Sequence, residues 1–324
     1  MTRVGGSAIV GAIDPMSATE KPTVDFWVEL PFNRSEVPDM HKLIGVAAVA
    51  VVASATITAC GSGGAASPQG CSPAVGASDL VHAGTLTIST NATLPPMQYV
   101  DANGNVTGMR IDIGDEIAKR LCLKPDFVNV DFDAQIPGVQ GKRWDMIDTG
   151  LFYTPERAQT LDLVPYERQA VAVAVPKGDP RHIAAVDDLA GKTIGVEAPG
   201  YEFDTLNSLA AKFATEGKPK LTVRGFQTNA DAFQALAAGQ VDGAAIVDSV
   251  TTYYEKDGRF TTAVGGINPA PLAMGFAKHS PISAVVAKTL SQMRADGWLT
   301  AVFKKYGVQG YQGNIAVSTG SLGS

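Results

Sequence analysis

Residues 84–310 alternate short strand-like runs with segments of helical spacing, and this alternation constrains the fold more than any other feature of the chain. Residues 85–90 alternate apolar and polar side chains, which predicts a half-buried strand. Apolar side chains at helical spacing then predict a helix over 112–122. Strands and helices that follow one another in this way are typical of α/β folds with largely parallel sheets.

The same pattern continues to the end of this region. Further strands are expected at 127–130, 146–151, 171–175, 192–196, 221–226 and 243–247. Further helices are expected over 203–213, after the capping residue Asn229, and over 281–295 and 298–306. The region is long enough for two modest lobes, each with its own core.

An apolar run that ends at a cysteine precedes the alternating region. The positive pair His41 and Lys42 is followed by the apolar residues 43–59 and then by Cys60. This order is the pattern of a bacterial lipoprotein signal, whose cysteine receives lipid such as palmitate while everything before it is removed. The alternative is a retained transmembrane helix, but the run is short for a span and Gly, Ser and Thr interrupt it.

The segments around this run are expected to lie outside the fold. Residues 1–39 are rich in acidic side chains and lie upstream of the positive pair, so we expect either a leader or an over-called start, with Met40 as a natural first residue. The signal itself is then expected at 40–59. Residues 60–83 begin with a Gly- and Ser-rich stretch, which predicts a flexible, lipid-anchored tether.

Composition argues against several classes of function. The formal net charge is −6 and Lys and Arg are scattered, so neither nucleic acid nor an anionic membrane surface is an expected partner. The histidines are isolated and lack metal-ligand spacing. The sequence has no nucleophile elbow, phosphate loop or dinucleotide fingerprint. We therefore expect no metal, no cofactor and no enzymatic activity.

The cysteines that remain after lipidation of Cys60 are Cys71 and Cys122. An oxidising exterior would allow these two thiols to pair. Two unpaired thiols are the alternative, because the sequence does not show how close the two Cα atoms come.

A series of short motifs resembles the family 3 solute-binding proteins of amino-acid ABC transporters. The motifs are Gly84 to Ile88, Leu94 to Met97, Gly108 to Asp112, Asp131 to Pro137, Trp144 to Ile147, Thr154 to Arg157, Gly239 to Ala244, Gly297-Trp298 and Lys305 to Gly307. Their order and spacing over some two hundred residues make the resemblance specific. It implies a two-lobed periplasmic-binding-protein-like fold of type II, with a ligand cleft between the lobes.

The resemblance also implies roles for individual residues. Arg157 would hold the ligand carboxylate through two parallel hydrogen bonds, and Asp248, at the end of an apolar strand, would receive the ligand ammonium group. Phe132 would stack on the ligand side chain, and Gly150 would let the backbone approach the ligand. The structural alternatives are an ion pair of Arg157 with Glu156, a helix cap at Asp248, a core aromatic and a simple turn.

Departures from the family pattern bear on the ligand. Phe152 and Leu94 replace a common hydroxyl donor and a common aromatic, and Asn91 stands where binders of cationic amino acids often keep an acid. Tyr201 and Glu202 lie in a turn with one added residue, which leaves their match uncertain by one position. We therefore expect a zwitterionic amino acid, or a similar amino-carboxylate, with an uncharged side chain preferred over lysine or arginine.

Arg110 is a further departure, because it stands where the family commonly has Asp. The expected division of the chain is lobe 1 at 84–170 and 271–310, lobe 2 at 171–270, hinge strands at 171–175 and 272–276, and a C-terminal tail at 311–324.

The expected function is that of a monomeric, lipid-anchored, extracytoplasmic component of an ABC importer, which binds a small amino acid and delivers it to a membrane permease. One alternative is a dehydratase-like enzyme on the same fold, in which Glu202 or Asp248 acts as general acid beside Arg157. The other is a ligand-sensing domain that contacts a signalling partner.

Overall fold

A computed structural model describes Cys71 and residues 74–179, 181–256, 258–318, 320 and 322. The chain separates into Met1–Ala55 and Thr56–Ser324, and all described residues belong to the second unit. The expected leader and signal, the lipidation site Cys60 and most of the tether lie outside the described residues. Within those residues, no helix is both long enough and apolar enough to cross a membrane.

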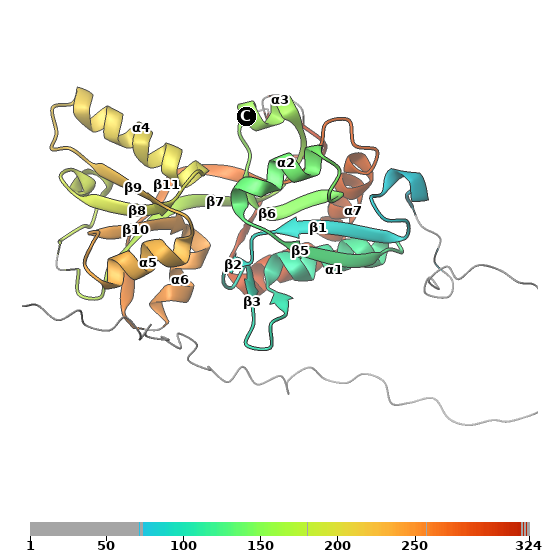
Figure 1. Ribbon diagram of the computed structural model, residues 1–324, viewed down its shortest axis with the longest axis horizontal. Helices are drawn as coiled ribbons and strands as arrows, with labels where there is room; N and C mark the ends of the chain where they lie inside the picture. Colours follow the sequence, from blue (N-terminus) through green and yellow to red (C-terminus); the bar gives the residue numbers. More distant parts are fainter. Residues whose placement is uncertain are drawn as a thin grey trace, which may run out of the picture. The chain divides into compact units, whose positions relative to one another are not determined.

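A nine-stranded sheet runs through the described region in the order β5-β1-β6-β11-β7-β10-β8-β9, with β12 beside β7 (Figure 1). Its strands are β1 (Thr85–Thr90), β5 (Lys124–Asn129), β6 (Met146–Phe152), β7 (Leu161–Pro176), β8 (Thr193–Glu197), β9 (Thr222–Phe226), β10 (Gly243–Val247), β11 (Phe260–Ala277) and β12 (Gln309–Gly310). A small separate sheet contains β2 (Thr93–Leu94), β3 (Gln98–Val100) and β4 (Val106–Thr107).

Each half of the sheet has a parallel core, as the alternation of strands and helices predicts. In lobe 1, β1 pairs in parallel with β5 and β6. In lobe 2, β8 pairs in parallel with β9 and β10. The predicted α/β class is therefore confirmed, and antiparallel pairing is concentrated where the two lobes meet.

Helices cover the sheet in both lobes, and in lobe 2 α4 lies on one side of the strands with α5 and α6 on the other (Figure 1). Lobe 1 carries α1 (Met109–Arg120), α2 (Gln135–Gln140), α3 (Pro155–Thr160), α7 (Ser283–Ala295) and α8 (Trp298–Tyr306). Lobe 2 carries α4 (Tyr201–Thr215), α5 (Asn229–Ala237) and α6 (Asp248–Glu255). Short 3-10 turns lie at η1 (Ala77–Asp79), η2 (Phe132–Ala134) and η3 (Val186–Leu189).

The strands β7 and β11 join the two lobes and are much longer than the predicted hinge strands. They pair antiparallel from Phe260 beside Pro176 to Ala277 beside Leu161, with several register shifts. Near its end β7 also pairs with β10 of lobe 2, and near its end β11 pairs with β6 of lobe 1. Each strand therefore contributes to both lobes, and the pair forms the connection between them.

The described part of the expected C-terminal tail packs onto lobe 1. Ile315 is buried at 3% exposure, and Ser318 forms an antiparallel bridge with Leu163 of β7. The Arg294 guanidinium donates a hydrogen bond to the carbonyl of Gly313 at 2.7 Å. Lobe 1 therefore extends beyond residue 310. The mostly small and polar residues that follow have no periodic pattern from which this packing could be predicted.

Cys71 and Cys122 are joined by a disulfide, with their Cα atoms 5.7 Å apart. The bond ties the segment before β1 to the turn that follows α1 and closes a loop with a sequence separation of 51. Closing a loop of this kind stabilises a folded domain by about 2–4 kcal/mol, chiefly through the unfolded chain.

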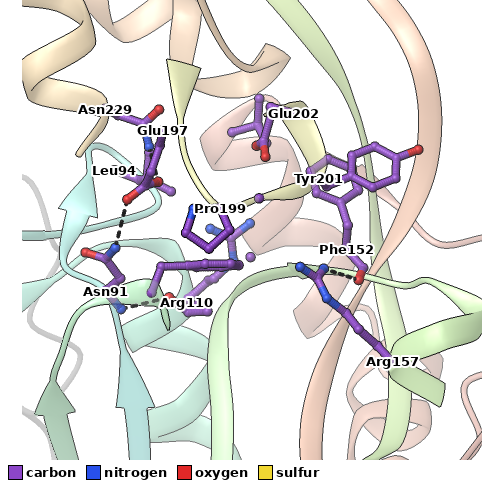
Figure 2. Close-up of a pocket in the computed structure, with 15 residues that line it drawn as sticks. Asn91, Leu94, Arg110, Phe152, Arg157, Glu197, Pro199, Tyr201, Glu202 and Asn229 are labelled. Atoms are coloured by element: carbon purple, nitrogen blue, oxygen red, sulfur yellow. Dashed lines mark hydrogen bonds between the residues drawn. The ribbon is translucent and has the colours of Figure 1, made fainter. Parts of the chain in front are cut away.

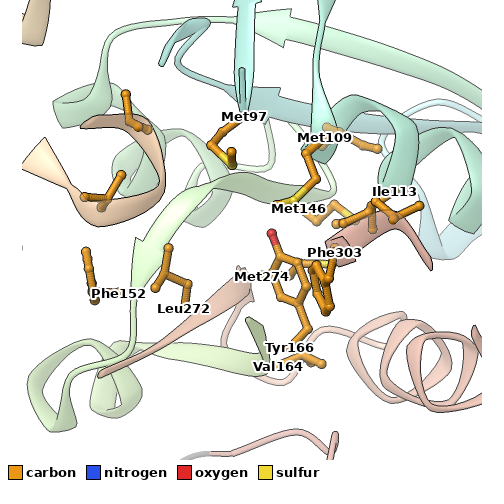
Figure 3. Close-up of a cluster of buried hydrophobic side chains, with 14 of the residues drawn as sticks. Met97, Met109, Ile113, Met146, Phe152, Val164, Tyr166, Leu272, Met274 and Phe303 are labelled. Carbon is orange, nitrogen blue, oxygen red and sulfur yellow. The ribbon is translucent and has the colours of Figure 1, made fainter. Parts of the chain in front are cut away.

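The core of lobe 1 fixes the elements that carry the site. Met109 and Ile113 of α1, Met146 of β6, Met274 of β11 and Tyr166 of β7 belong to one cluster of buried side chains (Figure 3). All five side chains are 1% exposed or less. Burial of such side chains stabilises by about 1.5–3 kcal/mol each, so the beginnings of α1 and β6 are held in place.

Candidate functional site

A cavity lies where strands of both lobes end. Asn91 follows β1, Phe152 ends β6, Glu197 ends β8 and Val247 ends β10, and all four line the same space (Figure 2). The complete lining is Asn91, Leu94, Arg110, Phe132, Thr149, Gly150, Phe152, Arg157, Glu197, Pro199, Gly200, Tyr201, Glu202, Asn229 and Val247. Open α/β sheets bind ligands in this position, at the carboxyl ends of their strands. Of the expected ligand residues, only Asp248 is missing from the lining.

Arg157 is held in the cavity wall by the start of α3. Thr154 caps the helix, because its hydroxyl accepts a hydrogen bond from the Arg157 N–H at 3.2 Å, and Pro155 suits the first helical position. The guanidinium donates to the Phe152 carbonyl at 2.7 Å and lies 5.8 Å from the centre of the Phe132 ring. These contacts fix the side chain with its charged end at the cavity (Figure 2).

The charge of Arg157 is only weakly compensated. Burial lowers the pKa of Arg157, and the charge of Glu202 opposes this more than those of Asp204 and Glu156. No carboxylate among the described residues forms an ion pair with the guanidinium, so the expected alternative of a pair with Glu156 is not seen. Arg157 thus retains donors for an anionic group.

Glu197 and Glu202 bring two acids into the cavity from lobe 2. Burial raises the pKa of Glu197 to about 7, and the charge of Glu202 adds to this rise. Burial also raises the pKa of Glu202, while its own backbone N–H and the charge of Arg157 act against that rise. Both acids have a raised pKa and lie close together. A bound cation is therefore favoured here, because it would stabilise their ionised forms.

The two lobes touch across the cavity. The Asn91 amide of lobe 1 donates to Glu197 of lobe 2 at 3.3 Å, and the rings of Phe152 and Tyr201 stack with centroids 4.1 Å apart. The space open to water is about 20 Å³, little more than one water molecule needs. An amino acid can therefore enter only when these contacts separate.

Asp248 does not reach the cavity. It is the first residue of α6, one position earlier than the expected helix, and the Ser249 N–H beside it donates to Gln169 at 3.2 Å. Burial raises the pKa of Asp248, and the nearby backbone groups of Ala170 and Ser249 oppose the rise. Val247 is the N-cap of α6 and no side chain caps this helix, so the alternative of a cap at Asp248 is not seen either.

A buried ionic network lies under the cavity floor. Arg110 is 1% exposed, and its Nη2 lies 2.9 Å from both carboxylate oxygens of Glu167. Its Nη1 donates to Gln98 at 2.5 Å, and its Nε donates to the Tyr166 hydroxyl at 3.3 Å. Tyr166 in turn donates to Asp148 at 2.7 Å. The departure from the family pattern at Arg110 is therefore compensated inside this chain.

Gly150 is required by this network. Its φ is +80°, and a Cβ at this position would lie 3.0 Å from Arg110 Nη1. The sequence suggested either close approach of ligand to the backbone or a simple turn at this glycine. The structure adds a third reason, because the guanidinium of Arg110 packs directly against it.

Asp148 makes the stability of the protein depend on pH. Burial raises the pKa of Asp148 to about 7, against the lowering effect of the Arg110 charge, and its Oδ2 has no hydrogen-bond partner among the described residues. The folded state therefore keeps a proton that the unfolded state loses near its ordinary pKa of 3.8. Stability is expected to fall as the pH rises between these two pKa values and to level off above about pH 7.

The variant Asp148→Asn is expected to flatten this dependence, because an amide carries no ionisable proton. Urea unfolding of both proteins at about pH 4.5, 6 and 8 measures it. If the free energy of unfolding changes with pH equally in the two proteins, Asp148 is already ionised in the folded state.

Sequence reasoning missed several lining residues, above all Glu197. Its signal was available, since Glu197 follows the apolar strand-like run 192–196 just as Asp248 follows 243–247. Asn229 was predicted only as a helix cap, but Thr228 caps α5 and the Asn229 amide donates to Glu197 at 2.6 Å. No group of three or more His, Cys, Asp or Glu side chains in the described ranges is placed to hold a metal ion.

Two α/β lobes, two crossing strands and a cavity at the strand ends define a two-lobed solute-binding protein. Residues 86–309 match the family model of the bacterial extracellular solute-binding proteins, family 3. The chain belongs to this family, so the predicted family and the two-lobed fold are both confirmed. Proteins of this family are extracytoplasmic.

Individual relatives are similar over most of the alternating region. The L-cystine-binding protein TcyA of Bacillus subtilis (strain 168) is 30% identical over 230 residues, which cover 69% of this chain and 81% of that protein. An ancestral arginine-binding protein bound to arginine has a TM-score of 0.63 and 29% identity, covering 69% of this chain and 98% of the other. An ancestral amino acid-binding protein, a precursor of cyclohexadienyl dehydratase, has a TM-score of 0.59 and 29% identity, covering 69% and 95%.

Proposed function

We propose that this protein captures an amino acid between its two lobes and delivers it to the permease of an ABC importer. The observation that carries the proposal is Arg157, a guanidinium at the cavity without an ion-pair partner among the described residues. A ligand carboxylate would supply the missing charge through charge-assisted hydrogen bonds. Similarity to proteins named for binding arginine and cystine supports an amino acid as the ligand.

Glu202 is the proposed partner of the ligand amine, in place of Asp248. The α-amine of an amino acid is one carbon away from the carboxylate, so its acid must lie near Arg157. Glu202 meets this requirement, because its charge has the largest effect of any acid on the pKa of Arg157. Leu94, Phe132 and Phe152 are proposed to contact the ligand side chain, since all three line the cavity.

A thermal-shift screen tests this proposal. The expected result is that some L-amino acids raise the melting temperature, because a ligand that binds only the folded state stabilises it by mass action. The corresponding amines without a carboxylate, and acids without an amine, are expected to have little effect. A simple amine or a simple carboxylate that stabilises the protein as well as every amino acid does would contradict the proposal.

Lipid on Cys60 is the proposed anchor that keeps the binding protein at the membrane. The variant Cys60→Ser is expected to move the protein from the membrane fraction to the soluble fraction and to lose incorporation of a fatty-acid analogue. Ser62→Ala, two residues further on, serves as the control and should keep both. Fatty-acid label retained by the Cys60→Ser protein would exclude this site.

A dehydratase-like activity is the second candidate function. It is favoured by two enclosed carboxyl groups of raised pKa, Glu197 and Glu202, which suit proton transfer, and by the likeness to a dehydratase precursor. Mass spectrometry of a bound ligand after prolonged incubation separates the two functions. A binding protein returns its ligand unchanged, whereas an enzyme yields a product that has lost water.

A further inference from the structure

The cavity has two polar ends with different chemistry. Arg157 lies at one end beside Phe152, and Glu197 lies at the other with Asn91 and Asn229 (Figure 2). The acids whose charges act on Arg157 are Glu202, Asp204 and Glu156, and Glu197 is not among them. A ligand whose carboxylate and α-amine bind at Arg157 and Glu202 would therefore direct its side chain toward Glu197.

The Glu197 carboxylate is oriented but not saturated. Its Oε1 accepts from the Asn91 amide at 3.3 Å and its Oε2 accepts from the Asn229 amide at 2.6 Å. The Asn91 amide is itself oriented, because its Oδ1 accepts a hydrogen bond from Thr93 at 2.9 Å. A carboxylate accepts about four hydrogen bonds, so each oxygen of Glu197 keeps an acceptor position for a ligand.

The balance of charge at the cavity leaves one acid without a cation. Arg110 is neutralised by Glu167, which leaves Arg157 opposite both Glu197 and Glu202. A zwitterion with an uncharged side chain would satisfy Arg157 and Glu202 but would leave Glu197 either protonated or ionised without a counter-charge, and neither state gains an ion pair. A ligand with a second cationic group satisfies all three.

We propose, on the basis of the proposed amino-acid binding, that Glu197 selects ligands whose side chain ends in an ammonium or guanidinium group. Glu197 belongs to lobe 2, and it meets Asn91 of lobe 1 only where the lobes touch. The acid that selects the side chain is therefore brought to the lobe 1 wall by closure, and a cationic ligand favours the closed form. This proposal replaces the preference for an uncharged side chain that was expected from the sequence. That expectation gave little weight to Glu202 and assigned no role to Glu197.

Calorimetric titration of the purified full-length protein and its Glu197→Gln variant tests this selection. L-Arginine and L-lysine are compared with L-leucine and L-glutamine. The wild type is expected to bind arginine or lysine more tightly than leucine, and Glu197→Gln is expected to reduce this preference at least about tenfold. An unchanged preference in the variant, or a wild type that prefers leucine, overturns the inference.

The variant Glu202→Gln is the matched control, because it removes an equal charge from the same cavity. It is expected to weaken cationic and uncharged amino acids alike and to leave their affinity ratio within about threefold. A loss of preference equal to that of Glu197→Gln would assign the selection to total charge and overturn the role of Glu197. If no amino acid binds the wild type, the proposed function fails as well.

A charge swap separates selection from damage to the fold. In the double variant Asn91→Asp/Glu197→Gln the acid moves to the facing side chain of lobe 1, and the preference for arginine over leucine is expected to return. Failure of the preference to return, in a protein that melts at the wild-type temperature and binds leucine normally, overturns the inference.

Discussion

Replacing Arg157 with alanine is expected to weaken amino-acid binding by about 2–5 kcal/mol, a loss of affinity between about thirtyfold and several thousandfold. The loss is large because the ligand carboxylate would remain enclosed in a cavity that also holds Glu202, without its cation. The Phe152 carbonyl also loses its hydrogen bond from the guanidinium, but this carbonyl belongs to the backbone of β6 and keeps its place. Calorimetric titration with the amino acid that stabilises the wild type most measures the effect.

The variant Arg157→Lys is the matched control for charge. Lysine keeps the positive charge but lacks the planar fork that gives two parallel hydrogen bonds to a carboxylate. It is expected to recover part of the affinity that alanine loses, but not all of it. If Arg157→Ala binds as tightly as the wild type and unfolds at the same temperature, the guanidinium does not hold the carboxylate.

Replacing Glu167 with alanine is expected to destabilise the protein by about 3–5 kcal/mol. The change leaves the guanidinium of Arg110 buried at 1% exposure without its counter-ion, and the charge of Glu167 is the largest influence that keeps this guanidinium protonated. Urea unfolding at neutral pH gives the free energy of unfolding for comparison with the wild type.

The double variant Arg110→Met/Glu167→Met tests whether the cost comes from the unpaired charge. It removes both charges and keeps apolar volume at both positions, so it is expected to lose much less stability than Glu167→Ala alone. A double variant that is as unstable as the single one would assign the loss to packing around Tyr166 and Gln98 instead of to the ion pair.

The parallel strands of the two lobes could be predicted from the sequence because their signal is local. Residues 85–90, 192–196 and 243–247 carry uninterrupted apolar or alternating patterns, and the structure has β1, β8 and β10 there. The hinge strands could not be predicted over their full length. In β7 the polar residues Glu167 and Gln169 interrupt the apolar pattern, and the groups that compensate them lie far away in the sequence, such as Arg110.

The candidate site shows the same division between local and distant information. The position of Arg157 depends on a local cap at Thr154, and the resemblance to the family was sufficient to find it. Asp248 and Glu197 are both acids at the ends of apolar strands, so the pattern alone does not distinguish them. What separates them in the structure is a distant partner: the Asn91 amide of lobe 1 donates to Glu197, which lines the cavity, whereas Asp248 is not in the lining.

A crystal structure with the amino acid that raises the melting temperature most tests the central claim directly. We predict that the ligand lies between the lobes, with its carboxylate about 3 Å from the Arg157 guanidinium and its α-amine at the Glu202 carboxylate. A ligand bound outside the cavity, or one whose carboxylate lies away from Arg157 while the guanidinium still contacts only the Phe152 carbonyl, would contradict the account.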